Sequence, residues 1–97
     1  MKTRFHIGFG AASVLCLVLA GCDVPPEGTS VEDVSAFEAA AASIGCDLVG
    51  ESDYLPVELQ TGLTREQSTG MASYLVATDR AVRLSTGGIR VTTGACA

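Results

Sequence analysis

Cysteine is the residue type with the most distinctive chemistry in this chain, and its four copies stand in two settings. Cys16 and Cys22 belong to an apolar N-terminal stretch, whereas Cys46 and Cys96 lie far apart in a more polar sequence. The thiolate is the nucleophile for alkylation and for disulfide exchange, and it is also a metal ligand. The surroundings of each cysteine therefore indicate which reaction it is suited to.

The residues around Cys16 have the layout of a secretory signal peptide. Lys2 and Arg4 give a basic start, and an apolar run follows from about Ile7 to Ala20. This run is shorter than the about 20 apolar residues that a membrane-spanning helix needs, which argues against an uncleaved anchor.

Leu19-Ala20-Gly21-Cys22 completes this layout and resembles the lipobox of bacterial lipoproteins, in which leucine and two small residues precede a cysteine. The resemblance covers only residues 1–22. It implies that a diacylglyceryl group is attached to the Cys22 sulfur and that the chain is cut between Gly21 and Cys22. The alternative is an ordinary signal peptide that ends beside a cysteine by chance. We expect residues 1–21 to be the signal peptide and membrane lipid to be the partner of Cys22, on the extracytoplasmic side of a bacterial envelope.

Residues 22–29 have the composition of a tether between this anchor and a domain. Pro25 and Pro26 favour an extended chain and Gly28 adds a joint. Asp23, directly after the cysteine, resembles a signal for retention at the inner membrane in some Gram-negative bacteria. It slightly favours the inner membrane if the organism is of that kind.

Removal of the signal peptide changes the chemistry that is open to the chain. The loss of Lys2 and Arg4 leaves four arginines against eleven acids, a formal charge of −7, with no histidine, lysine or tryptophan. Ser-His and Cys-His nucleophile pairs, Ser-Lys dyads and imidazole metal ligands are therefore excluded. No glycine-rich phosphate loop precedes a helix, and no pair of carboxylates is marked out for a hydrolase. We expect no enzyme activity, no metal and no cofactor.

Cys46 and Cys96 are the two cysteines of the remaining domain, residues 30–97. A domain this small buries little core and usually needs an additional constraint. In an oxidising envelope such a pair is expected to form a disulfide, which on the chain-entropy model contributes about 4 kcal/mol for a loop of this length. The alternative is two free buried thiols.

Apolar spacing predicts a first helix from Ser30 to Gly45. Ser30 and Asp33 form a weak capping box at its start, and Gly45 suits a left-handed end. Its buried stripe is expected to comprise Val31, Val34, Phe37, Ala41 and Ile44.

Two further helices follow a short strand, Cys46–Val49. The second helix is expected to start near Asp53 and Pro56 and to end at Gly62, with Leu55 and Leu59 inward. The third begins at the capping box Thr64–Gln67 and buries Met71, Tyr74, Leu75 and Thr78. Gly70 within it costs about 1 kcal/mol unless a neighbour packs close there.

From Ala81 the apolar period changes to two, which predicts a hairpin. With Gly87-Gly88 as a two-residue turn, Leu84 pairs with Val91 and Val82 with Thr93. Four apolar residues then share the inner face: Val82, Leu84, Ile89 and Val91.

The predicted class is α+β, and the order helix, strand, helix, helix, hairpin resembles the winged-helix arrangement. The resemblance rests on element order alone. It implies a small sheet against three helices, which suits a disulfide because Cys46 opens the first strand and Cys96 follows the last. Winged helices commonly bind DNA, which requires cationic contacts to phosphates. The charge of −7 and the extracytoplasmic anchor argue against it, so we expect no nucleic-acid partner.

Three arginines are the candidate partner contacts: Arg80, Arg83 and Arg90. Residues 22–66 hold ten acids and one arginine, whereas residues 67–97 hold one acid and these three. We expect Arg83 and Arg90 on the solvent face of the hairpin, docking an acidic partner surface or anionic lipid head groups. The alternatives are that Arg80 only complements a helix dipole and that the others keep an edge hairpin soluble.

These observations favour a small membrane-anchored envelope lipoprotein whose domain is an interaction or structural module with an envelope protein as partner. The alternative is an accessory or inhibitory subunit of a membrane-bound enzyme complex. A pull-down of the solubilised lipoprotein separates the two.

Overall fold

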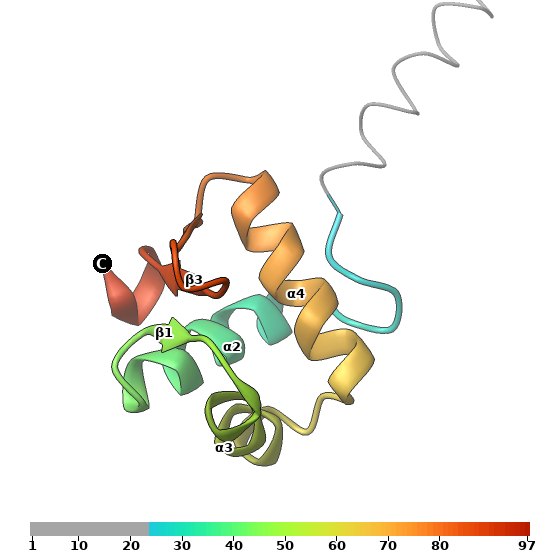
Figure 1. The fold of residues 1–97 in the computed structure, drawn as a ribbon. Coiled ribbons are helices and arrows are strands. Elements are labelled where there is room, and N and C mark those ends of the chain that lie inside the picture. The colour runs from blue at the N-terminus through green and yellow to red at the C-terminus, as the bar shows by residue number, and fades with distance from the viewer. Residues whose placement is uncertain (1–23) are drawn as a thin grey trace, which may run out of the picture.

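A computed structural model describes residues 24–97 of the chain, which form three helices, a three-stranded sheet and a C-terminal 3-10 turn (Figure 1). The helices are α2 (Val31–Ser43), α3 (Glu51–Thr61) and α4 (Arg65–Ala77). The strands are β1 (Asp47–Leu48), β2 (Ala81–Arg83) and β3 (Ile89–Val91), and the 3-10 turn is η1 (Gly94–Cys96). The predicted α+β class and order of elements are confirmed.

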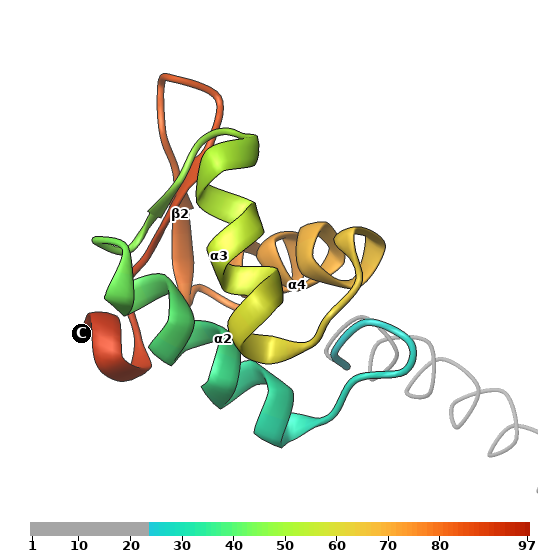
Figure 2. The ribbon, with the colours of Figure 1, turned by 90° about the horizontal axis from the view of Figure 1, so that it is seen from below.

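The sheet has the strand order β1-β3-β2, with both pairings antiparallel. The short strand β1 therefore lies beside β3, the second strand of the hairpin, although about 40 residues separate them in sequence. Figure 2 shows the hairpin standing beside α3 and α4, with α2 and the C-terminal turn near its base. This is the small sheet against three helices that the element order implied.

One core lies between the sheet and the helices. Its fully buried large apolar side chains come from all three helices and from two strands: Phe37, Leu48, Val57, Met71, Leu75 and Val91. The helices and the sheet therefore bury their apolar side chains in the same core.

The predicted helix ends are largely confirmed. At the start of α4, Gln67 N–H donates to Thr64 Oγ1 (3.0 Å), and Thr64 N–H donates to Gln67 Oε1 (3.1 Å). At the start of α2, Ser30 N–H donates to Asp33 Oδ2 (2.9 Å). Gly62 ends α3 at φ +76° and Gly45 follows α2 at φ +97°, both left-handed.

The predicted orientation of α3 is wrong. The helix begins at Glu51 rather than near Pro56, because Asp53 Oδ2 accepts hydrogen bonds from Val49 N–H (2.9 Å) and Gly50 N–H (3.3 Å) and so organises an earlier first turn. Val57 is then the buried residue. Leu55 and Leu59, each two positions from Val57 and thus on the opposite side of a helix, are 48% and 84% exposed.

In α2 the predicted stripe is correct except at its first residue, since Val31 is 75% exposed. It occupies the first helical position, beyond the edge of the core. Ala40 is buried instead, at 2% exposure.

The predicted hairpin register is also wrong. Ala81 pairs with Val91, Val82 with Arg90 and Arg83 with Ile89. The loop is longer than expected, because Leu84 N–H donates to Gly88 O (2.8 Å) and, among residues 84–88, only Gly87 has a positive φ, +101°. The register therefore slips by an odd number of residues, which moves Val82 to the outer face at 50% exposure.

Residues 24–29, the described part of the expected tether, lie along α4 in Figure 1 and are called the docked segment below. A Cβ added to Gly70 would lie 3.2 Å from Pro26 Cγ, so Pro26 packs directly on this glycine. Gln67 Nε2 donates to Glu27 O (3.4 Å). The docked segment is thus the close neighbour expected to account for a glycine within α4.

Candidate functional site

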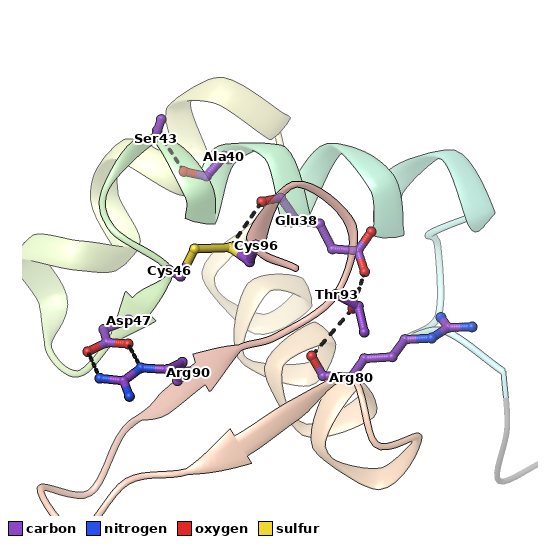
Figure 3. Close-up of a disulfide and its surroundings, with 9 residues drawn as sticks. All are labelled: Glu38, Ala40, Ser43, Cys46, Asp47, Arg80, Arg90, Thr93 and Cys96. Atoms are coloured by element: carbon purple, nitrogen blue, oxygen red, sulfur yellow. Dashed lines mark hydrogen bonds and ion pairs between the residues drawn. A yellow bond between two sulfur atoms is a disulfide. The ribbon is translucent and has the colours of Figure 1, made fainter.

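The Cys46–Cys96 disulfide joins the turn before β1 to η1 (Figure 3). The Cα atoms are 5.9 Å apart, within the usual range for a bridge. Val91 N–H donates to Cys46 O (2.9 Å), so the sheet also holds this cysteine in place. The bridge predicted from the sequence is confirmed.

A buried carboxylate that sequence reasoning missed lies beside the disulfide. Glu38 of α2 is 8% exposed and accepts a hydrogen bond from Thr93 Oγ1 (2.5 Å), as Figure 3 shows. A Cβ added to Gly94 would lie 2.6 Å from Glu38 Cδ, so this carboxyl packs on the backbone of η1. No pattern in the sequence marks Glu38, because its partners come from residues 55 positions or more away.

Arg90 is engaged within the sheet. Its Nε and Nη2 donate to Asp47 Oδ1 (2.7 Å) and Oδ2 (3.0 Å), a two-pronged pair between β3 and β1 (Figure 3). The hydrogen bond from Arg90 lowers the pKa of Asp47, and the same bond raises the pKa of Arg90. The expectation that Arg90 is available to an external acid is therefore not supported by its contacts.

Arg83 lies on the other side of the hairpin from Arg90, on the side of its cross-strand partner Ile89. The two arginines do not share a face, which corrects the expectation from the sequence. Within residues 24–97, Arg83 has neither an ion-pair partner nor an aromatic ring beneath it.

Arg83 lines a cavity of about 250 Å³ between the hairpin tip, the end of β1 and the middle of α4. Tyr54, Thr69 and Ser73 also line it, with Ile89 and Leu48 as apolar lining. The Thr69 hydroxyl donates to the backbone carbonyl of Arg65 (3.0 Å), which leaves Tyr54 and Ser73 as the hydroxyl-bearing residues for a ligand. Gly88 makes the approach of the hairpin possible, since a Cβ there would lie 2.6 Å from Val49 Cα. The cavity therefore combines one cation with hydroxyls and an apolar wall, which suits a carboxylate that carries some apolar surface.

Arg80 follows α4 and stacks on Tyr74, with its guanidinium carbon 5.7 Å from the ring centroid. Its Nη1 also lies 3.5 Å from the Tyr74 hydroxyl. In Figure 3 its side chain extends away from the disulfide, on the side where the docked segment runs.

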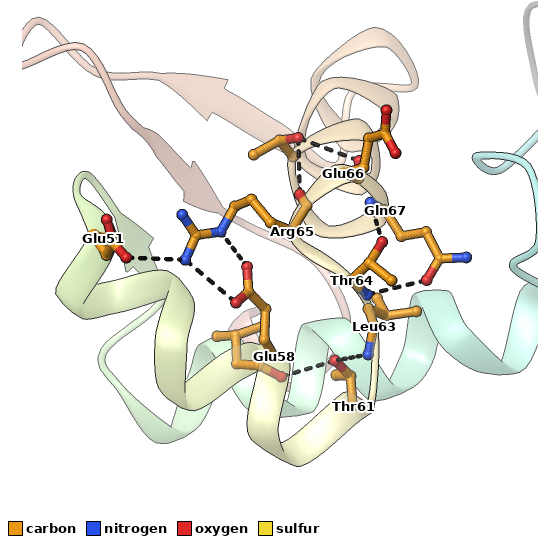
Figure 4. Close-up of polar contacts among 10 residues, drawn as sticks. Glu51, Glu58, Thr61, Leu63, Thr64, Arg65, Glu66 and Gln67 are labelled. Carbon is orange, nitrogen blue, oxygen red and sulfur yellow. Dashed lines mark hydrogen bonds and ion pairs between the residues drawn. The ribbon is translucent and has the colours of Figure 1, made fainter.

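Arg65, which was not among the candidate contacts, is the most heavily paired arginine. It donates to Glu58 of α3 through Nε and through Nη2 (3.3 Å), and Nη2 lies 3.7 Å from Glu51 (Figure 4). These carboxylates raise its pKa. Its guanidinium also lies 5.8 Å from the ring of Tyr54, whose pKa is raised by burial. This cluster ties α3 to α4 and is structural.

No three acidic, cysteine or histidine side chains of residues 24–97 are grouped so that they could hold a metal ion. In the same range no helix is both long and apolar enough to cross a bilayer. Gly21 and Cys22 lie outside the described residues, so the lipidation and cleavage sites stay predictions.

Comparison with protein-family models, with curated proteins and with solved structures finds no match to this chain.

Proposed function

We propose that this protein is a lipid-anchored lipoprotein of the bacterial cell envelope whose domain serves as a non-catalytic interaction module. The observation that carries the proposal is the pairing of two cysteine chemistries in one short chain. Leu19-Ala20-Gly21-Cys22 has the residues of a lipidation site, and Cys46 and Cys96 form a bridge of the kind that persists in oxidising compartments. Both point to export.

The cavity at the hairpin tip is the surface that best fits a protein partner. Arg83 has no partner within residues 24–97 and stands at the wall of this cavity, whereas Arg65 and Arg90 are neutralised by carboxylates. An acidic side chain of an envelope protein, inserted there, would meet the guanidinium, with Tyr54 and Ser73 in the same wall. The remaining surface is predominantly acidic, which disfavours acidic partners elsewhere on the domain.

Anchoring is tested by mass spectrometry of the membrane fraction from cells that express the full chain. The expected species begins at Cys22 and carries the mass of attached acyl groups. Cys22→Ser is expected to leave unprocessed precursor. An intact Met1 terminus in the native protein, or a soluble form that begins elsewhere, would contradict the proposal.

Partner binding is tested by cross-linking in the membrane fraction, followed by capture of the lipoprotein. Arg83→Ser is expected to reduce the captured partner several-fold, most strongly at low salt, because the cation is lost from the cavity. The exposed substitution Val82→Ser, on the opposite face of the same strand, is the matched control and should leave capture unchanged. Equal capture by both variants contradicts the cavity assignment. A single enzyme partner, captured in an amount equal to that of the lipoprotein, identifies an accessory subunit.

A further inference from the structure

The docked segment runs antiparallel to α4, which determines where the chain leaves the domain. Gly28 lies against Gln67, and Pro26 lies against Gly70. Lower numbers in the segment thus meet higher numbers in the helix, so Val24 is directed toward the C-terminal half of α4. Figure 1 shows this end of the segment beside that half of the helix.

The next step rests on the proposed lipid anchor at Cys22. Only two residue steps separate Val24 from Cys22, and an extended chain covers at most about 7 Å in that distance. The head-group layer of a bilayer is itself roughly 5 to 8 Å deep. A domain held at Val24 by an acylated Cys22 therefore rests on the membrane surface rather than hanging free of it.

The side chains next to this exit have the chemistry of a membrane interface. Tyr74 lies one helical turn beyond Gly70 on the same side of α4, and Arg80 stacks on its ring at 5.7 Å. Both side chains are partly exposed. Tyrosine is enriched at the depth of lipid head groups, and the guanidinium fork suits phosphate oxygens.

Charge along α4 gives this surface a direction. Glu27 and Glu66 lie together at the N-terminal end of the helix, around a hollow of about 580 Å³ beside Thr64. Arg80 follows its C-terminal end. Asp79 and Arg80 offset each other at this end, whereas two acids stand at the other. An anionic membrane surface therefore repels the N-terminal end more strongly, so the helix is tilted with Arg80 toward the lipid.

We propose that the side of α4 that carries Tyr74 and Arg80 rests on phospholipid head groups, with the Arg80 guanidinium contacting lipid phosphate. Thr69 and Ser73, which line the cavity with Arg83, lie on another side of the same helix. The docked segment thus fixes an orientation in which the membrane covers one side of α4 and the cavity is left open to a partner.

The chain provides its own reporters, because it contains two tyrosines, Tyr54 and Tyr74, and no tryptophan. Lipidated protein that begins at Cys22 is reconstituted into vesicles of phosphatidylcholine and phosphatidylglycerol that contain a lipid with a nitroxide on its head group. In Tyr54→Phe, where Tyr74 is the remaining tyrosine, the nitroxide should remove most of the fluorescence. In Tyr74→Phe, where Tyr54 remains, it should remove little.

Arg80→Gln in the Tyr54→Phe background tests the phosphate contact. Quenching of Tyr74 should fall several-fold in anionic vesicles, whereas Arg83→Gln, with the same loss of charge, should leave it unchanged. Protein that does not float with the vesicles overturns the anchor and the orientation with it. Protein that floats but shows equal quenching of the two tyrosines overturns the orientation alone, and equal quenching in Arg80→Gln and Arg83→Gln overturns the phosphate contact.

Discussion

The two ends of the small sheet are built differently. At the disulfide end (Glu38, Cys46, Thr93 and Cys96) a covalent bridge and a buried carboxylate hold the C-terminal turn against α2. At the hairpin tip (Leu84–Gly88) the chain is held by the close approach of Gly88 to the backbone of Leu48 and Val49, and a cavity remains beneath it. One end is held by a disulfide and a side-chain hydrogen bond. The other is held by close backbone packing that a glycine permits.

This difference separates stability from recognition. At the disulfide end Arg90 is paired with Asp47, and the buried Glu38 accepts a hydrogen bond from Thr93. The hairpin tip leaves Arg83 without a partner within residues 24–97. The covalent constraint and the open cavity thus lie at opposite ends of the sheet.

The largest effect is expected from the bridge. Cys96→Ala should lower the free energy of unfolding by about 4 kcal/mol, because the loop of 50 residues is no longer closed in the unfolded chain. Chemical denaturation of the domain with and without reductant measures it. Reductant should destabilise the native domain by a similar amount and leave Cys96→Ala unchanged. A reductant effect on the variant would contradict the assignment of stability to this bond.

The hairpin tip is expected to be the next most sensitive. Gly88→Ala should cost about 1 to 3 kcal/mol, since the new Cβ meets backbone atoms of Leu48 and Val49 that cannot turn aside. Thr86→Ala, exposed in the same loop, is the control and should change the melting temperature little. Similar melting temperatures for both variants would show that the tip is not held by this contact.

The buried carboxylate contributes a smaller increment at the disulfide end. Thr93→Val removes the hydroxyl that donates to Glu38 and should cost about 1 kcal/mol, the usual net value of a hydrogen bond. Thr92→Val, on an exposed neighbour, provides a matched change of the same kind. Denaturation midpoints of the two variants decide whether Glu38 holds η1 or only packs against it.

The smallest effect concerns the exposed pair in the sheet. Arg90 lowers the pKa of Asp47 in the folded chain. The stability that the Asp47 carboxylate contributes is therefore present above the ordinary carboxyl pKa and is lost as pH falls through the lowered pKa. In Arg90→Gln the pKa of Asp47 should rise toward its ordinary value, as followed by NMR titration of the carboxyl carbon. An unchanged titration would mean that the pair does not form in solution.

Features that depend on neighbouring residues were predictable from the sequence. The capping box of Thr64 and Gln67 and the left-handed ends at Gly45 and Gly62 involve contacts within a few positions. The bridge between Cys46 and Cys96 followed from counting, because the domain offers no other cysteine. The α+β class followed from the change of apolar period after α4.

Features that depend on distant segments were decided by the tertiary structure. Apolar residues on both sides of α3 left its orientation open, and packing of Val57 against the core exposed Leu55 and Leu59. Gly88 closes a longer loop than expected, since its carbonyl accepts from Leu84 N–H, and it also packs on Leu48 and Val49. The resulting hairpin register placed Arg83 at the cavity and Arg90 beside Asp47. Hydrogen bonds between residues close in sequence can be predicted from the sequence. Which face of a helix or strand is buried depends on close packing, which exists only when all the elements are assembled.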